Sequence, residues 1–112
     1  PGVLVQTRVL GGAVARVPAE ATAFAHRATT VQITIINGHD GTDEAPHAAW
    51  ATEFAAAITP AGAGAYVNFL AEEGEARIRA AYPGTTYERL VAVKRRWDPS
   101  NVFRSTQNIR PI

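Results

Sequence analysis

The most constraining feature of this sequence is a helical segment enclosed by two chain breaks near the C-terminal end. Pro83-Gly84 stops the segment before it, and Pro99 disfavours a helical conformation for Asp98. Thr85 and Glu88 have the spacing of a capping box, and the apolar residues between the breaks recur at helical spacing. The sequence therefore predicts a helix that begins near Thr85, ends at Asp98 and turns one apolar stripe towards a core. The stripe consists of Tyr87, Leu90, Val91 and Trp97.

The residues that follow this helix predict a reversal of the chain. Residues 98–101 form a turn sequence, after which Val102 and Phe103 begin an extended tail. Residues 94–96 are three cations in the last helical turn, where they meet the negative end of the helix dipole and face solvent. We therefore expect the C-terminal tail to return across the fold.

The rest of the chain predicts an α+β domain, a mainly antiparallel sheet with helices packed on one face. Alternating or β-branched residues predict strands, and apolar positions three and four residues apart predict helices. The predicted strands and extended segments are 3–10, 13–17, 23–27, 31–36 and 65–70, and the further helices are 43–58 and 72–82. Because strands and helices are not regularly interleaved, a parallel sheet is not expected.

Length and charge restrict the functional classes. The chain has 112 residues, which we interpret as a single domain over 1–112, and its net charge is +1. Such a balanced charge predicts neither nucleic-acid nor membrane partners. No apolar run approaches the roughly 20 residues of a membrane helix, and no secretory signal is visible, so we expect a cytoplasmic protein. The absence of cysteine excludes disulfides and thiol chemistry.

Several blocks of the sequence resemble one enzyme family. The strongest is Tyr-x-Arg-Leu-x-x-x-Lys at 87–94, followed by Asp-Pro-x-Asn-x-Phe-Arg at 98–104 and Gln-Asn-Ile at 107–109. Together these are similar to the C-terminal signature of berberine-bridge-enzyme-like FAD-linked oxidases. Further blocks match the substrate domain of those enzymes in the same order, at 10–14, 23–27 and 65–70. The resemblance therefore extends over nearly the whole chain.

The resemblance implies a role beside a flavin. The chain would be the C-terminal, substrate-domain portion of an oxidoreductase that transfers hydride from substrate to FAD, its sheet covering a flavin held by a separate domain. The glycine-rich pyrophosphate loops of that FAD-binding domain do not occur in these residues. We therefore expect no FAD binding and no oxidation by this chain alone, and we expect an FAD-binding domain as its partner, in the same or another chain.

The resemblance also suggests which residues face the site. Tyr66 and Asn68 fall on one side of the predicted strand, where they could contact a flavin rim or orient a substrate. Asn68, Gln107 and Asn108 are the candidate cofactor-binding residues. The alternatives are a Tyr66 hydroxyl bonded to a backbone group and a solvated Gln-Asn pair.

Two departures from the family argue against an acid–base centre. Many relatives have tyrosine where Phe69 stands, and that phenol is associated with deprotonation of the substrate. Phe69 has no proton to exchange. Ala13 and Ala15 occupy substrate-facing positions without offering an ionisable group. No catalytic residue is therefore assigned, and Tyr66 is the remaining candidate.

Two further groups of polar residues are interpreted from the residues alone. His26 and Arg27 belong to a block that we expect to form hydrogen bonds within the fold. His39, Asp43 and His47 have spacings that would align metal ligands on a helix, with Asp40 nearby. Glycines and a proline interrupt that segment, so no metal site is expected. The interrupting residues are Gly38, Gly41 and Pro46.

Two other functional classes remain open at this point. A sheet face that has lost its covering domain would seek another chain, which predicts a free-standing, non-catalytic homodimer joined through that face. A small α+β module that binds a ligand is the third interpretation.

Overall fold

The computed structural model describes residues 2–38, 40–41, 43–60, 63–70, 74–105 and 107–112. The chain forms two compact units, each built from two separate segments. We call Pro1–Leu10 with Thr29–Ala63 the strand unit, and Gly11–Ala28 with Gly64–Ile112 the helical unit. Each unit is described by itself.

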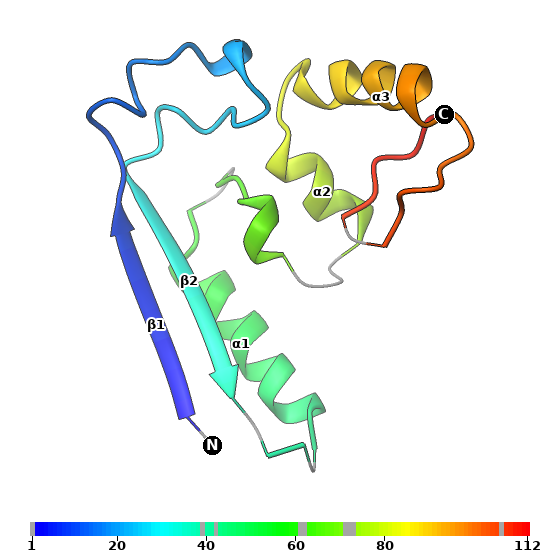
Figure 1. Ribbon diagram of the computed structural model, residues 1–112. Coiled ribbons are helices and arrows are strands. Elements are labelled where there is room, and N and C mark those ends of the chain that lie inside the picture. The colour runs from blue at the N-terminus through cyan, green and yellow to red at the C-terminus, as the bar shows by residue number, and fades with distance from the viewer. Residues whose placement is uncertain (1, 39, 42, 61–62, 71–73, 106) are drawn as a thin grey trace. The chain divides into compact units, whose positions relative to one another are not determined.

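The strand unit is built on two antiparallel strands, β1 (Gly2–Val9) and β2 (Val31–Gly38), shown in Figure 1. Their register pairs Gly2 with Gly38 at one end and Val9 with Val31 at the other. Both segments are rich in β-branched residues, which fit a pleated surface. The predicted strands 3–10 and 31–36 are confirmed, as is the α+β class.

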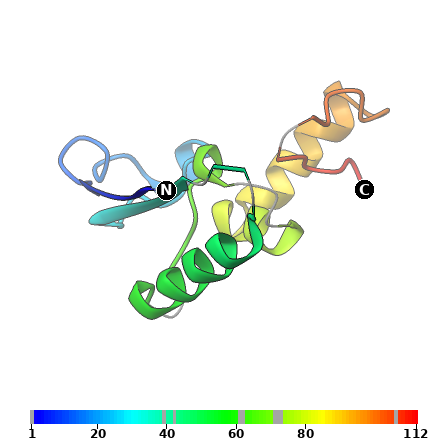
Figure 2. The same ribbon diagram turned by 90° about the horizontal axis from the view of Figure 1, so that it is seen from below.

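The helix α1 (Ala45–Ile58) lies to one side of these strands (Figures 1 and 2). It begins with Pro46 in its first turn, as predicted, and Asn37 Nδ2 on β2 donates to the His47 carbonyl oxygen at 2.9 Å. Trp50 and Phe54 stack with ring centroids 5.2 Å apart, yet Trp50 is 39% exposed. The apolar stripe of α1 therefore exists but is only partly covered, because two strands offer too little surface to bury it.

The strands also leave much of their apolar surface exposed. Every residue of β1 is exposed, and β1 pairs on one edge only within the described residues. The exposed aliphatic side chains are Val3, Leu4, Val5, Val9, Val31, Ile33 and Ile36. An open edge flanked by aliphatic side chains is suited to pairing with further polypeptide.

The helical unit contains α2 (Glu75–Ala81), α3 (Thr86–Trp97) and two short 3-10 turns, η1 (Ala19–Ala21) and η2 (Val67–Phe69). Its buried apolar residues are Ala65, Ala81 and Tyr87. The Arg79 guanidinium lies over the Tyr87 ring, 4.1 Å from the centroid. Burial of Tyr87 confirms the inward position predicted for it.

Three predicted extended segments of this unit are not strands. Residues 13–17 form turns, 23–27 are irregular, and 65–70 contain η2. Their backbone bonds are local, such as Val14 N–H to Gly11 O at 3.1 Å and Phe69 N–H to Tyr66 O at 2.9 Å. A strand needs a neighbour for its backbone groups, and the described residues supply none here.

The predicted helix after Pro83-Gly84 is confirmed, but two of its details are wrong. Thr85 immediately precedes α3 without a side-chain capping bond, so the capping box does not form. Trp97 is 73% exposed rather than part of the buried stripe, and the Arg96 guanidinium lies 5.0 Å from the centroid of its ring. Tyr87 lies near the start of α3, where the unit covers it. Trp97 lies in the last turn, beyond that covered part of the helix.

The carboxylate of Asp98 joins the end of α3 to the C-terminal tail. It accepts the backbone N–H groups of Val102 at 2.7 Å and Phe103 at 3.0 Å, and it forms an ion pair with Lys94. Lys94 also donates to the Phe103 carbonyl oxygen at 2.6 Å. Asn101 takes a positive φ of 52°, a conformation that asparagine tolerates better than most residues. The predicted turn and chain reversal are therefore confirmed (Figure 1).

We expect acid to weaken this junction through Asp98. The hydrogen bond from Lys94, assisted by the two backbone donors, lowers the pKa of Asp98. Its stabilising effect is therefore complete above the unfolded value of about 3.9 and is lost as pH falls through the lower folded pKa. Urea unfolding at a series of acidic pH values should show this loss in the wild type and a smaller one in Asp98→Asn.

Glu53→Gln is the matched control, because it removes the same charge from an exposed position on α1. Equal pH dependence in Asp98→Asn and the wild type would contradict the role given to the carboxylate.

Candidate functional site

An aromatic cluster in the helical unit surrounds the residues singled out by the sequence. Phe24 meets His26 and Tyr66 edge to face, with ring centroids 6.1 Å and 5.6 Å away, and Phe69 lies 5.6 Å from Tyr66. Edge-to-face contacts of this kind favour one arrangement of the rings. The cluster therefore fixes the segment that carries Tyr66 against the segment that carries Phe24.

Gly64 allows these two segments to approach each other. A Cβ atom on Gly64 would lie 2.0 Å from His26 Cε1, closer than any real contact. The Nε2 atom of His26 is buried and has no hydrogen-bond partner among the described residues. The imidazole therefore acts here as a packed ring, and only glycine fits beside it. Sequence analysis gave Gly64 no role because its importance comes from a distant histidine.

Arg27 has the hydrogen-bonding role that the sequence predicted. Its Nε donates to the Phe24 carbonyl oxygen at 2.9 Å, and its Nη2 donates to Thr22 Oγ1 at 2.7 Å. Its Nη1 donates to the Val14 carbonyl oxygen at 3.3 Å, and its guanidinium lies 5.0 Å from the Phe24 ring centroid. One side chain thus supplies donors to three parts of the segment 11–28, which lacks regular strand bonds.

Tyr66 and Asn68 lie together, as predicted, but through a different local structure. Asn68 Nδ2 donates to the Tyr66 hydroxyl oxygen at 3.0 Å across η2. The tight turn brings the two side chains together, where the prediction relied on the alternation of a strand. The hydroxyl of Tyr66 is thereby paired with an amide side chain, leaving its own proton available to a ligand.

Tyr82 is a further member of this neighbourhood, and sequence analysis assigned no functional role to it. Burial, and then the neighbouring Tyr66, raise the pKa of the Tyr82 phenol. The Tyr82 phenol therefore stays protonated near neutral pH and acts as a hydrogen-bond donor rather than as a base. In the sequence, Tyr82 is marked only by its position directly before Pro83-Gly84. That position does not indicate that Tyr66 lies nearby.

The C-terminal motif reaches the same region. Gln107 Nε2 donates to the Leu70 carbonyl oxygen at 2.8 Å, at the end of the segment that carries Tyr66 and Asn68. Gln107 and Asn108 also line a hollow of about 380 Å³ between α2, α3 and the tail. The two sequence blocks predicted to approach a cofactor are therefore joined by a hydrogen bond.

Other predicted residues lie apart from this region or outside the description. Ala13 and Ala15 are exposed and lie in turns rather than on a strand. His39 lies outside the described residues, while Asp43 Oδ1 accepts the Ala45 N–H at 3.2 Å in the strand unit. In the described ranges no three metal-ligating side chains gather, and no described helix is long and apolar enough to cross a membrane.

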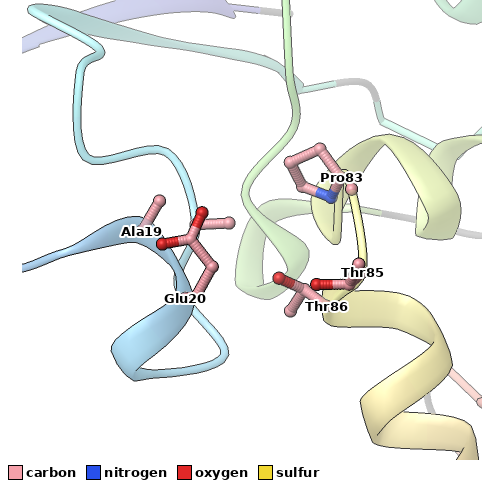
Figure 3. A pocket seen from close by; sticks show the side chains of 7 residues that line it. Ala19, Glu20, Pro83, Thr85 and Thr86 are labelled. Carbon is pink, nitrogen blue, oxygen red and sulfur yellow. The ribbon is translucent and has the colours of Figure 1, made fainter.

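A second hollow of the helical unit, of about 220 Å³, lies between η1 and the start of α3. Figure 3 shows the Glu20 carboxylate and the hydroxyls of Thr85 and Thr86 around it. Arg89 of α3 donates to the Glu20 carbonyl oxygen, which fastens η1 to the helix. Thr86 is buried, so this junction contributes to the unit's packing.

Comparison with known proteins gives two results. Residues 65–110 match the family described as "Berberine and berberine like". The chain is also 34% identical over 106 residues to "Uncharacterized FAD-linked oxidoreductase YgaK" of Bacillus subtilis (strain 168), a match that covers 94% of this chain and 23% of that protein. "Uncharacterized FAD-linked oxidoreductase YvdP" of the same organism is 31% identical over 102 residues, covering 90% of this chain and 23% of its own length.

We expect Gly64→Ala to destabilise the helical unit by about 1–3 kcal/mol, the usual effect of forcing an extra methyl group into a packed contact. The added carbon would displace the His26 ring and with it Phe24. Urea unfolding followed by aromatic circular dichroism measures the loss. Gly2→Ala is the control, because a Cβ there meets nothing within 4 Å. Equal stability of the two variants would contradict the close approach.

We also expect one tyrosine to ionise late. Because the raised pKa of Tyr82 favours the protonated phenol in the fold, this contribution is complete below the unfolded value of about 10 and is lost as pH rises through the folded pKa. The tyrosinate absorbance of the wild type should therefore contain a late transition, and Tyr82→Phe should lack it. Loss of an earlier transition would assign the perturbed phenol elsewhere.

Proposed function

Because residues 65–110 match the family described as "Berberine and berberine like", we propose that this chain forms the C-terminal, substrate-side part of an FAD-linked oxidoreductase. The parent reaction would be hydride transfer from a substrate to the flavin. When bound, FAD supplies the redox chemistry, and the protein supplies position and hydrogen bonds. In this proposal residues 1–112 serve as one module beside an FAD-binding domain.

The names of the relatives suggest the cofactor, and their greater length suggests that this chain works as one part of a larger assembly. Both Bacillus proteins are named as FAD-linked, and the chain spans 23% of each. The uncovered apolar side chains of β1 and β2 agree with a module that packs against further polypeptide. An FAD-binding domain is therefore the partner that we propose.

One observation carries the placement of the site. The hydrogen bond from Gln107 to the Leu70 carbonyl oxygen unites the C-terminal motif with the Tyr66–Asn68 pair. We propose that Asn68 and Gln107, with Asn108, lie nearest the flavin, and that the Tyr66 hydroxyl faces the substrate. The residues fit such a role because they offer amide and phenol groups that can bond the rim of a flavin or a substrate.

The same residues favour a module without catalysis of its own. Phe69 packs at the aromatic cluster without an exchangeable proton, and Ala13 and Ala15 lie in exposed turns. Tyr66 offers a phenol beside the Asn68 amide, which can orient a substrate by hydrogen bonding. A general base, where the reaction needs one, would come from the partner domain or the substrate.

A chimera tests this function. This chain would replace the matching segment of YgaK, and the purified product would be examined for bound FAD by its visible spectrum. We expect a yellow chimera, while the chain alone leaves added FAD unbound on a sizing column. Asn68→Ala in the chimera should shift the flavin spectrum because it removes a hydrogen-bonding amide near the ring.

Thr52→Ala is the matched control, since its hydroxyl bonds only the Ala48 carbonyl oxygen within α1, at 2.9 Å. A folded chimera that holds FAD but has the same flavin spectrum after Asn68→Ala would refute the placement of Asn68. FAD retained by the isolated chain would refute the need for a partner domain.

The exposed strands favour a second candidate, a non-catalytic homodimer joined through the sheet. Val5 and Ile33 are 42% and 43% exposed, and no described strand pairs with the second edge of β1. Light scattering of the isolated chain measures this. If the protein is a homodimer of this kind, the wild type is dimeric and Val5→Lys is monomeric. A monomeric wild type would exclude the homodimer.

A further inference from the structure

The hollow between α2, α3 and the C-terminal tail contains charges that the helical unit does not balance. It measures about 380 Å³, within the range of pockets that hold small ligands. The side chains that matter for its chemistry are Glu75, Ile78, Tyr87, Arg104, Asn108 and Arg110. All of them belong to the helical unit, so the hollow is formed within one compact body.

The carboxylate that lines this hollow is already engaged. Glu75 Oε1 accepts two hydrogen bonds from Arg79, from Nε at 3.1 Å and from Nη2 at 3.0 Å. Arg79 is held in place by its position over the Tyr87 ring. The negative charge of Glu75 is therefore paired with Arg79, which does not line the hollow. Glu75 does not neutralise the arginines of the tail.

Those arginines, Arg104 and Arg110, have no such partner. Both are exposed, and within the described ranges neither forms a hydrogen bond or an ion pair. Two guanidinium groups that line one hollow repel each other, and an anion between them removes that cost. Arginine also presents paired N–H donors that match the oxygens of a carboxylate or phosphate.

Asn108 adds a neutral donor to the same hollow. Its Oδ1 atom is an acceptor, which an anion does not satisfy, and it bonds none of the described residues. Its Nδ2 group likewise bonds none of them, so its two N–H donors are available. An amide donor beside two guanidinium groups is the composition expected of a site for an oxygen-rich anion.

We propose that this hollow binds the phosphate or carboxylate group of a small ligand, held by Arg104 and Arg110 with Asn108 as a further donor. The volume exceeds that of a single anion, and Ile78 offers an apolar surface for the rest of the ligand. Asn108 is shared with the proposed flavin role, whereas Arg104 and Arg110 are not, so variants of the two arginines test this site separately from that role.

Nuclear magnetic resonance titration of the full chain tests the site. Inorganic phosphate and, separately, succinate would be added at constant ionic strength while the side-chain N–H signals of Arg104, Arg110 and Asn108 are followed. We expect saturable shifts at these signals. Saturation by phosphate alone identifies a phosphate ester as the ligand class, and saturation by succinate alone identifies a carboxylic acid.

Variants separate a built site from general attraction of anions. Arg104→Ala and Arg110→Ala should each weaken binding by about tenfold or more, as expected for loss of a charged hydrogen bond. Arg104→Lys should bind more weakly than wild type because it keeps the charge but loses the paired donors. Arg16→Ala, which removes an equally exposed charge from a turn, should bind like wild type.

Two outcomes would overturn the site. One is the absence of saturable shifts with both anions. The other is an equal loss of affinity in Arg16→Ala and Arg104→Ala, which would show that the charge of the whole chain, rather than the hollow, attracts the anion. Because both tail arginines are exposed, circular dichroism should show unchanged helix content in every variant.

Discussion

The Asp98 carboxylate is the interaction on which the functional half of the chain depends. It ends α3, pairs with Lys94 and holds the backbone of Val102 and Phe103, so the tail leaves the helix in a fixed direction. Only with that direction set can Gln107 reach the Leu70 carbonyl oxygen. A single carboxylate thus links a helix terminus to the geometry of the candidate site.

The two hollows of the helical unit differ in what they can bind. The one beside η1 presents a carboxylate and hydroxyls and lies where α3 is fastened to the segment 11–28. The one beside the tail presents guanidinium and amide donors. The C-terminal tail contributes to both proposed sites. Gln107, with Asn68, is proposed to face the flavin, and Arg104 and Arg110 are proposed to bind an anion. One ligand could therefore contact both sites through neighbouring residues.

The sequence predicted elements well where local signals were sufficient. The proline and glycine breaks defined α3, and the β-branched runs defined β1 and β2. It failed at 13–17, 23–27 and 65–70, because an extended pattern becomes a strand only when another strand lies beside it. The proximity of Tyr66 and Asn68 was predicted, whereas Gly64 and Tyr82 owe their roles to distant contacts that spacing cannot reveal.

The division of each unit between two stretches of chain has a consequence for dissection by proteolysis or truncation. The chain passes from one unit to the other after Leu10, Ala28 and Ala63. A cut after Ala63 would leave the C-terminal fragment without Phe24 and Arg27, which order its aromatic cluster. The segment 11–28 must therefore be supplied to the C-terminal fragment, and joining it directly to Gly64 would give the smallest continuous chain that contains the whole helical unit.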